Sequence, residues 1–278
     1  MRNILRFILV IIMIITGTYA YFDYSKEQSD NEVYENVDQY INPTGPIFAN
    51  PEDKFIFSDK VNNSLENVLE YQQKYDWESL LALNKDIVGW LTIPDNDTIN
   101  FPVVQGTNNS YYLTHDYTKQ WNGNGNAFVD YKYNKFCLSK VIYGHNMSLS
   151  STNPIFTSVV NWKEKDYFDS HRTLYYTEAN GMTKKYLIVA IAHFNVAAND
   201  EFSYLQSRFE TEEEFRSWVQ YIENHSTYFD LDGNEIDYRA DEVLILSTCD
   251  RRIGYGSNGR TTLFCINLTN NELDEEMN

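Results

Sequence analysis

Among the three cysteines of this chain, Cys249 has the surroundings that best suit nucleophilic chemistry. It ends the apolar run VLILST and is followed by one aspartate and two arginines. A strand end mounts a side chain rigidly, and nearby guanidinium groups favour the thiolate, which is the form that attacks carbonyl carbons. Cys137 and Cys265 stand in apolar or strand-like settings that suit an inert buried thiol, the commoner state of a cysteine.

Acyl transfer at a cysteine also needs a group that moves protons, and the five histidines are the candidates. His145 lies in YGHNM, directly after the predicted strand KVIY, at a strand end that opens into a loop. His193 ends a long apolar strand, which suits either a core or an edge position. Position favours His145 over His193 but leaves both open. The remaining three stand in polar contexts and are expected to be solvated: His115, His171 and His225.

The third requirement is a positive group or backbone N–H donors that hold the developing oxyanion. Arg260 stands at the start of the predicted strand TTLFCIN, after a turn-rich stretch. A hairpin between the two flanking strands would bring it back beside Cys249. An ordinary surface arginine is the competing interpretation. Arg251 and Arg252 are rivals, although their closeness in sequence to the cysteine makes reaching over its sulfur harder.

The sequence lacks the signatures of several other functions. It has no phosphate-binding glycine loop, no CxxC pair, no HExxH and no His/Cys cluster at metal-ligand spacing, so we expect neither a cofactor nor a metal. Its carboxylates are scattered, which gives no support to a paired-carboxylate hydrolase. The net charge of -18 argues against nucleic acid as a partner, because a phosphate-binding surface needs clustered Lys and Arg.

The N-terminus predicts a membrane anchor over residues 1–22. Residues 7–22 carry no charge, and together with residues 3–6 a helix would reach about 30 Å, the thickness of the hydrocarbon layer. Arginines precede this run and acidic residues follow it. The positive-inside rule therefore predicts a single-pass protein of the cell membrane, with a cytoplasmic N-terminus and an extracellular domain. A cleaved signal peptide is the alternative, with TYA as a weak cleavage site.

The exported part divides into three segments. Residues 23–62 are acidic, contain two Asn-Pro pairs and predict a stalk. Residues 63–270 form the folded domain, and residues 271–278 form an acidic tail. At the start of the domain, a helix is predicted from Asn63 on its capping-box pattern, and a second helical stretch carries Trp77.

Short β-like runs separated by turns dominate the domain after residue 89. They are residues 90–93, 127–130, 140–143, 173–177, 185–193, 243–247 and 261–268. One helix interrupts them, where Thr211 and Glu214 form a capping box ahead of an apolar stripe. Many short strands with one inserted helix predict a mainly β fold, either a barrel or a sandwich.

Several of these motifs, taken in order, resemble the sortases, specifically class B. They are the stretch DIVGWLTIPDNDTINFPVVQGTNNSYYLTHD, then YGHNM, then LSTC, then an arginine that opens the next strand. The resemblance runs from about residue 65 to residue 268, and class B enzymes also carry an N-terminal anchor. It implies an eight-stranded β-barrel with N-terminal helices and a helix inserted before the strand that ends at the cysteine.

The resemblance also implies an activity. The chain would be an extracytoplasmic cysteine transpeptidase of a Gram-positive cell, which cleaves a C-terminal sorting motif of exported proteins after Thr through a thioester. The acyl group would pass to an amine of a cell-wall precursor or of a pilin. Cys249 would be the nucleophile, His145 the general acid and base, and Arg260 the residue that binds the substrate and steadies the oxyanion.

Four further positions match family positions that contact the sorting peptide or flank the nucleophile: Asn109, Leu113, Ser247 and Asp250. One departure from the family bears on the arginine, because the loop between Cys249 and Arg260 is slightly longer, richer in glycine and contains two extra arginines. Two other interpretations remain. A papain-like protease uses the same residue types, but its cysteine opens a helix. A non-catalytic adhesin or binding ectodomain would have the anchor, stalk and domain without a reactive thiol.

Overall fold

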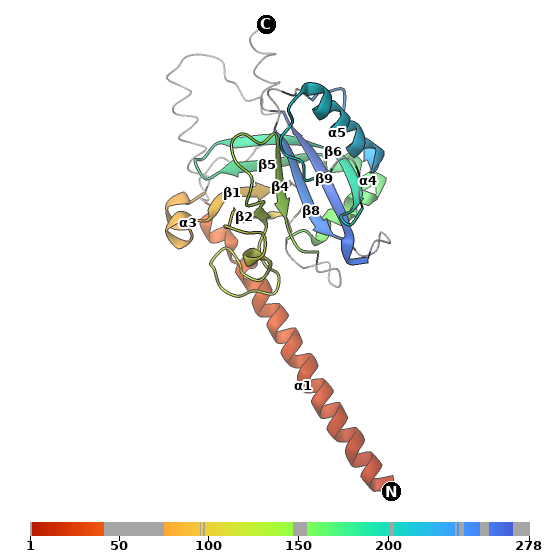
Figure 1. Cartoon of the computed structure of the whole chain (residues 1–278). Helices are drawn as coiled ribbons and strands as arrows, with labels where there is room; N and C mark the ends of the chain where they lie inside the picture. The colour runs from red at the N-terminus through yellow and green to blue at the C-terminus, as the bar shows by residue number, and fades with distance from the viewer. Residues whose placement is uncertain are drawn as a thin grey trace.

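The protein is described by a computed structural model in which a β-barrel carries a long N-terminal helix (Figure 1). The structure describes residues 2–41, 75–94, 96, 98–146, 155–198, 200, 203–236, 238, 242–250 and 256–268. The helices are α1 (Arg2–Glu35), η1 (Val37–Tyr40), α3 (Trp77–Leu83), η2 (Tyr111–Leu113), η3 (Thr157–Lys163), α4 (Lys165–Ser170), α5 (Glu212–Asn224) and η5 (Gly256–Asn258).

The described strands form one nine-stranded sheet in the order β5-β1-β2-β3-β4-β8-β9-β6-β7. Their bounds are β1 (Ile87–Thr92), β2 (Asn100–Val104), β3 (Phe128–Val129), β4 (Ser139–Tyr143), β5 (Thr173–Glu178), β6 (Thr183–Asn195), β7 (Ser226–Phe229), β8 (Val243–Cys249) and β9 (Gly259–Asn267). Because β5 also pairs with β6, every strand except β7 belongs to a closed ring, which confirms the eight-stranded barrel.

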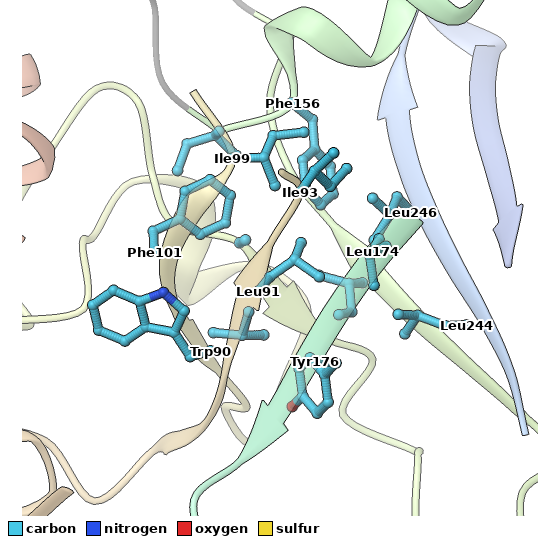
Figure 2. Packing of buried hydrophobic residues seen from close by; sticks show 14 of the residues in the cluster. Trp90, Leu91, Ile93, Ile99, Phe101, Phe156, Leu174, Tyr176, Leu244 and Leu246 are labelled. Carbon is cyan, nitrogen blue, oxygen red and sulfur yellow. The ribbon is translucent and has the colours of Figure 1, made fainter. Parts of the chain in front are cut away.

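Alternation along each strand divides the apolar side chains between two clusters, as β8 illustrates. Leu244 and Leu246 belong to the larger cluster, which contains side chains from β1, β2, β5 and β8 (Figure 2). Val243 and Ile245 belong to the second cluster, which packs between the barrel and α5. The barrel wall is therefore buried on both faces along β8, and only the end of that strand reaches solvent.

Helix α5 begins where the sequence predicts it. The Thr211 side chain accepts a hydrogen bond of 3.1 Å from the Glu214 N–H, which caps the helix and stabilises it by about 1 kcal/mol. The Glu214 carboxylate reaches back one residue further than in a capping box and accepts from the Glu210 N–H at 2.7 Å. The apolar stripe is buried against the second cluster through Phe215 and Trp218.

Helix α1 differs from the predicted stalk, because it continues past residue 23 to Glu35 and its last turns lie on the barrel. Tyr34 near the end of α1 and Val37 at the start of η1 are buried in the larger cluster. These two apolar residues, within an otherwise acidic segment, explain why this part of the chain docks. The N-terminal part of α1 projects away from the domain (Figure 1).

Between Leu9 and Phe22, the apolar side chains of α1 that the structure describes are exposed. Across the described residues, none of the helices has both the length and the hydropathy of a membrane-spanning segment. The helix predicted around Trp77 is confirmed as α3 and is capped by the Asp76 side chain. The helix predicted from Asn63 and the acidic tail at residues 271–278 lie outside the described residues.

Candidate active site

The β8–β9 hairpin places the arginine beside the cysteine. Cys249 is the last residue of β8 and its side chain is exposed. The two strands are antiparallel, and Cys249 stands directly opposite Arg260 in the register. Directly opposed residues project from the same face of a sheet, so the thiol and the guanidinium group share one face. Because Cys249 is the last residue of a strand, its placement differs from that of a papain-like cysteine, which opens a helix.

The parallel pairing of β4 with β8 brings His145 to the same edge. The last register pair of these strands is Tyr143 with Ser247. Beyond it, the Gly144 N–H donates to the Ser247 carbonyl at 3.1 Å, and the Thr248 hydroxyl donates to the Gly144 carbonyl at 2.8 Å. His145 and Cys249 each stand two residues past the last pair, at equivalent positions on neighbouring strands.

The backbone before His145 can follow this path only because residue 144 is glycine. A Cβ atom at Gly144 would lie 2.5 Å from Ile155 Cγ2 and 2.6 Å from Phe156 Cδ2, far inside van der Waals contact. The Phe156 N–H also donates to the His145 carbonyl at 3.1 Å. The buried residues 155–156 therefore hold the histidine backbone in place.

The His145 ring is held by a backbone carbonyl. Its Nε2 lies 2.9 Å from the carbonyl oxygen of Leu113, at the end of η2. Because a carbonyl oxygen only accepts, Nε2 is the donor in this hydrogen bond. In the neutral ring, Nδ1 then carries the lone pair and is the nitrogen that can accept a proton.

His193, the other histidine that the sequence left open, faces away from this edge. It stands opposite Thr261 in the β6–β9 register, one residue beyond Arg260, and so lies on the other face of the sheet from Cys249. Its ring nitrogens lie 3.1 Å from the Thr261 hydroxyl and 3.0 Å from the Thr227 hydroxyl.

Burial also affects the charge of His193. Burial lowers the pKa of His193 to about 4, the nearby Lys163 ammonium group adds to the decrease, and Asp250 opposes it. His193 is therefore neutral at pH 7 and engaged with threonine hydroxyls. Position and orientation together favour His145 as the proton-transfer group at the cysteine.

The Arg260 side chain is fixed on the turn beside the cysteine. Its Nη1 donates to the carbonyls of Ser257 and Gly259, both at 2.9 Å. Burial raises the pKa values of Tyr143 and Tyr204, and the positive charge of Arg260 opposes both increases. The guanidinium charge therefore acts across the face that carries Cys249. The rival Arg251 and Arg252 lie outside the described residues.

The two predicted peptide contacts in the loop after β2 have different environments. Leu113 is 37% exposed, and its backbone carbonyl is the group that contacts the His145 ring. Asn109 is engaged within the fold, because its amide donates to Asp130 at 2.9 Å and its oxygen accepts from the Tyr131 N–H at 3.0 Å. Asn109 thus fixes the path of the loop, and Leu113 is the residue that presents a side chain to solvent.

The two predicted positions next to the nucleophile are both buried, with 1% of their surface exposed. The Ser247 hydroxyl lies 3.0 Å from the Tyr204 hydroxyl. Asp250 forms an ion pair with Lys163 and accepts from the Thr261 hydroxyl at 3.1 Å. Both side chains therefore support the end of β8 from inside the protein.

Sequence reasoning missed Tyr204 and Lys163, which reach the nucleophile strand from distant segments. Tyr204 lies in an irregular segment and Lys163 in a short 3₁₀ helix, so neither follows a periodic pattern. The described residues contain no cluster of three or more His, Cys, Asp or Glu side chains that could hold a metal ion. Cys137 and Cys265 are buried free thiols, and burial raises the pKa of Cys265.

The chain is similar in sequence and in structure to known proteins. No family model matches the chain. The chain is 33% identical to sortase B of Listeria monocytogenes over 178 residues, which cover 63% of this chain and 68% of that protein. It is similar to the solved structure of Clostridium perfringens sortase B, with a TM-score of 0.60 and 26% identity over 68% of this chain and 98% of that one. A Staphylococcus aureus sortase B–substrate complex also matches, with a TM-score of 0.60 and 19% identity over 74% of this chain and 91% of that one.

Proposed function

Because the chain belongs to the sortase B family and is a cysteine transpeptidase, we propose that it joins exported proteins to an amine outside the cell, with Cys249 as its nucleophile. The observation that carries this proposal is the convergence of three side chains at one barrel edge. Cys249 is exposed opposite Arg260, and His145 stands at the equivalent position of the neighbouring strand.

In the first half of the reaction, the Cys249 sulfur attacks the carbonyl carbon of a threonine in the sorting peptide. The thiol proton passes to Nδ1 of His145, and the oxyanion of the tetrahedral intermediate is stabilised by Arg260 and backbone N–H groups. His145 then gives the proton to the leaving amine as the peptide bond breaks. The products are a thioester on Cys249 and the released C-terminal fragment.

In the second half, an amine attacks the thioester carbonyl. His145 takes the proton that the amine loses, the C–S bond breaks, and the proton returns to the Cys249 sulfur. The new amide joins the threonine carbonyl to the acceptor. We assign the acceptor to an amine of a cell-wall precursor or a pilin lysine, and water in its place would give slow hydrolysis.

For substrate recognition we propose a division of roles among the four positions matched to the family. Leu113 contacts the sorting peptide directly, because the residue is exposed and its backbone carbonyl is hydrogen bonded to His145. Asn109 shapes the loop that carries Leu113. Ser247 and Asp250 hold the end of β8, and with it Cys249, in position, because their side chains are buried and hydrogen bonded.

We place the enzyme at the outer face of the plasma membrane of a Gram-positive cell, held by residues 1–22 with the N-terminus in the cytoplasm. The support is the exposed apolar surface on the projecting part of α1 and the charge asymmetry around it. Carbonate extraction of cell membranes, with protease added to intact cells, tests this placement. Protein released by carbonate, or a barrel that is protected from protease, would contradict it.

The activity is tested with the full chain in detergent micelles, a quenched library of LPxTG-like and NPxTN-like peptides, and a small amine acceptor. Mass spectrometry should find cleavage after threonine and threonine-linked amine adducts. Both should be absent with Cys249→Ala and present with Cys137→Ala, which removes a buried thiol instead. Adducts that persist without Cys249 would contradict the proposed nucleophile.

A further inference from the structure

The last turns of α1 are hydrogen bonded to the glycine- and asparagine-rich segment 122–126. The Asp30 carboxylate accepts from the Gly123 N–H at 3.0 Å. The backbone carbonyl of Asp30 accepts from the side-chain amide of Asn122 at 2.8 Å. The Asn124 amide donates to the Asn31 side chain at 2.8 Å. The segment thus takes part of its support from a helix far away in the sequence.

Two buried tyrosines strengthen this contact. The hydroxyl of Tyr34, which is 9% exposed, donates to the Gly125 carbonyl. The Tyr117 hydroxyl donates in the other direction, to the Val33 carbonyl, at 3.2 Å. The two rings pack edge to face with centroids 6.2 Å apart. Both hydroxyl groups therefore connect α1 to the loop through specific hydrogen bonds within an apolar contact.

Segment 122–126 in turn packs against the carbonyl that holds the catalytic histidine. Gly125 has φ +62°, and a Cβ atom there would lie 2.5 Å from the Tyr112 carbonyl oxygen and 2.8 Å from the Leu113 carbonyl oxygen. The Asn126 N–H also donates to the Tyr112 carbonyl at 2.8 Å. The Leu113 carbonyl is the group that accepts from Nε2 of His145. Three successive contacts thus lead from Tyr34 to the imidazole ring.

We propose that the last turns of α1 position the catalytic histidine, with Asp30 and Tyr34 as the positioning residues. This inference rests on the proposed role of His145. Leu113 stands in a short 3₁₀ turn, outside the strand ladders that fix Cys249 and Arg260, so its carbonyl depends on neighbouring loops for its place. Without the contact from α1, segment 122–126 shifts, the Leu113 carbonyl moves off Nε2, and the ring loses both its orientation and its fixed tautomer.

The same arrangement connects the predicted anchor to catalysis. The helix that begins at Arg2 ends at Glu35, directly after the residues that hold segment 122–126. The chain is helical throughout this range, so the segment proposed as the anchor and the positioning residues belong to one continuous helix. A chain that lacks α1 should therefore keep its nucleophile and lose much of its turnover.

The test uses the full chain in detergent micelles, with Tyr34→Phe to remove one hydroxyl and Tyr24→Phe as the matched control. Tyr24 lies on the same helix with 62% of its surface exposed. We expect Tyr34→Phe to lower kcat about tenfold, the equivalent of one lost hydrogen bond, with KM for the sorting peptide unchanged. Tyr24→Phe should behave like the parent chain. Asp30→Asn is the second variant, should Tyr34→Phe fail to fold.

A spectroscopic readout separates this inference from the proposed activity. Nitrogen NMR of the histidine side chains, assigned with His145→Gln, should show His145 in the Nε2–H tautomer and a mixture of tautomers in Tyr34→Phe. This comparison needs no turnover, so it remains informative even if no peptide is cleaved. Unchanged His145 signals in folded Tyr34→Phe would overturn the inference, whether or not kcat falls.

Discussion

Gly144→Ala is the substitution whose consequence follows most directly from the geometry of the site. The added Cβ would lie 2.5 Å from Ile155 Cγ2, whereas non-bonded carbon atoms pack at about 3.5–4.0 Å. Ile155 and Phe156 are fully buried and belong to the larger apolar cluster. Neither side chain can move into solvent, so the backbone before His145 must shift by about 1 Å.

A displacement of this size is expected to lower kcat by about 10²-fold, because catalytic groups tolerate little misplacement. It should also cost about 1–3 kcal/mol of folding stability, which is typical of overpacking. Gly89→Ala is the matched control. A Cβ there would lie 2.8 Å from the Thr177 carbonyl oxygen and would overlap the Tyr176 ring, on β1, three strands from β4 in the sheet.

The assay compares the two variants below their melting temperatures, with the amount of folded protein measured by circular dichroism. Both should unfold at lower temperature than the parent chain, but only Gly144→Ala should lose turnover per folded molecule. Thiol labelling of Cys249 should stay similar in both. A folded Gly144→Ala enzyme with kcat within twofold of the parent would refute the reasoning that the close packing of residue 144 positions His145.

Three further substitutions test other parts of the site and the barrel. Arg260→Ala should lower turnover about 10²–10³-fold while Cys249 is still labelled by thiol reagents, because an oxyanion donor is lost and the nucleophile is kept. In the folded chain the pKa of His193 is about 4, below its ordinary value of 6.5. Between these two pH values the unfolded chain binds more protons than the folded chain, so the free energy of unfolding falls as the pH falls through this range. Urea unfolding should therefore give a lower free energy of unfolding at pH 5 than at pH 7 in the parent chain. This difference between the two pH values should be smaller in His193→Gln. Glu242 pairs at 3.0 Å with the buried Lys140 and accepts from the Tyr133 hydroxyl at 2.7 Å. Glu242→Gln leaves that buried charge without this partner, so it should destabilise the fold by about 3 kcal/mol with kcat unchanged. An unaltered melting curve would contradict this prediction.

Residue patterns predict the nucleophile strand and its hairpin well. An apolar run that stops at Cys249, a turn-rich loop and a second strand that opens at Arg260 lead directly to the observed pairing, because consecutive antiparallel strands usually neighbour each other. Helix α5 and its cap at Thr211 are predictable for a similar reason, since cap and apolar stripe are local features.

Features that depend on pairing between distant strands are not predictable from local patterns. His145 and His193 both lie at strand ends, and only the register of β6 with β9 shows that His193 faces away from Cys249. Strand β2 contains Pro102, which argues against a strand by local rules, yet it pairs with both β1 and β3. The docked part of α1 is hidden in an acidic segment, where Tyr34 gains its role from a loop far away in the chain.

The most direct test of the central claim is the identity of the residue that carries the acyl group. The full chain would be mixed with a cleavable sorting peptide without an amine acceptor, quenched in acid and mapped by tandem mass spectrometry. We predict a threonine-terminated acyl group on Cys249 as a thioester, which disappears on addition of an amine as the threonine-linked product forms. An acyl group found on Cys137, or product that accumulates while Cys249 is never acylated, would contradict the account.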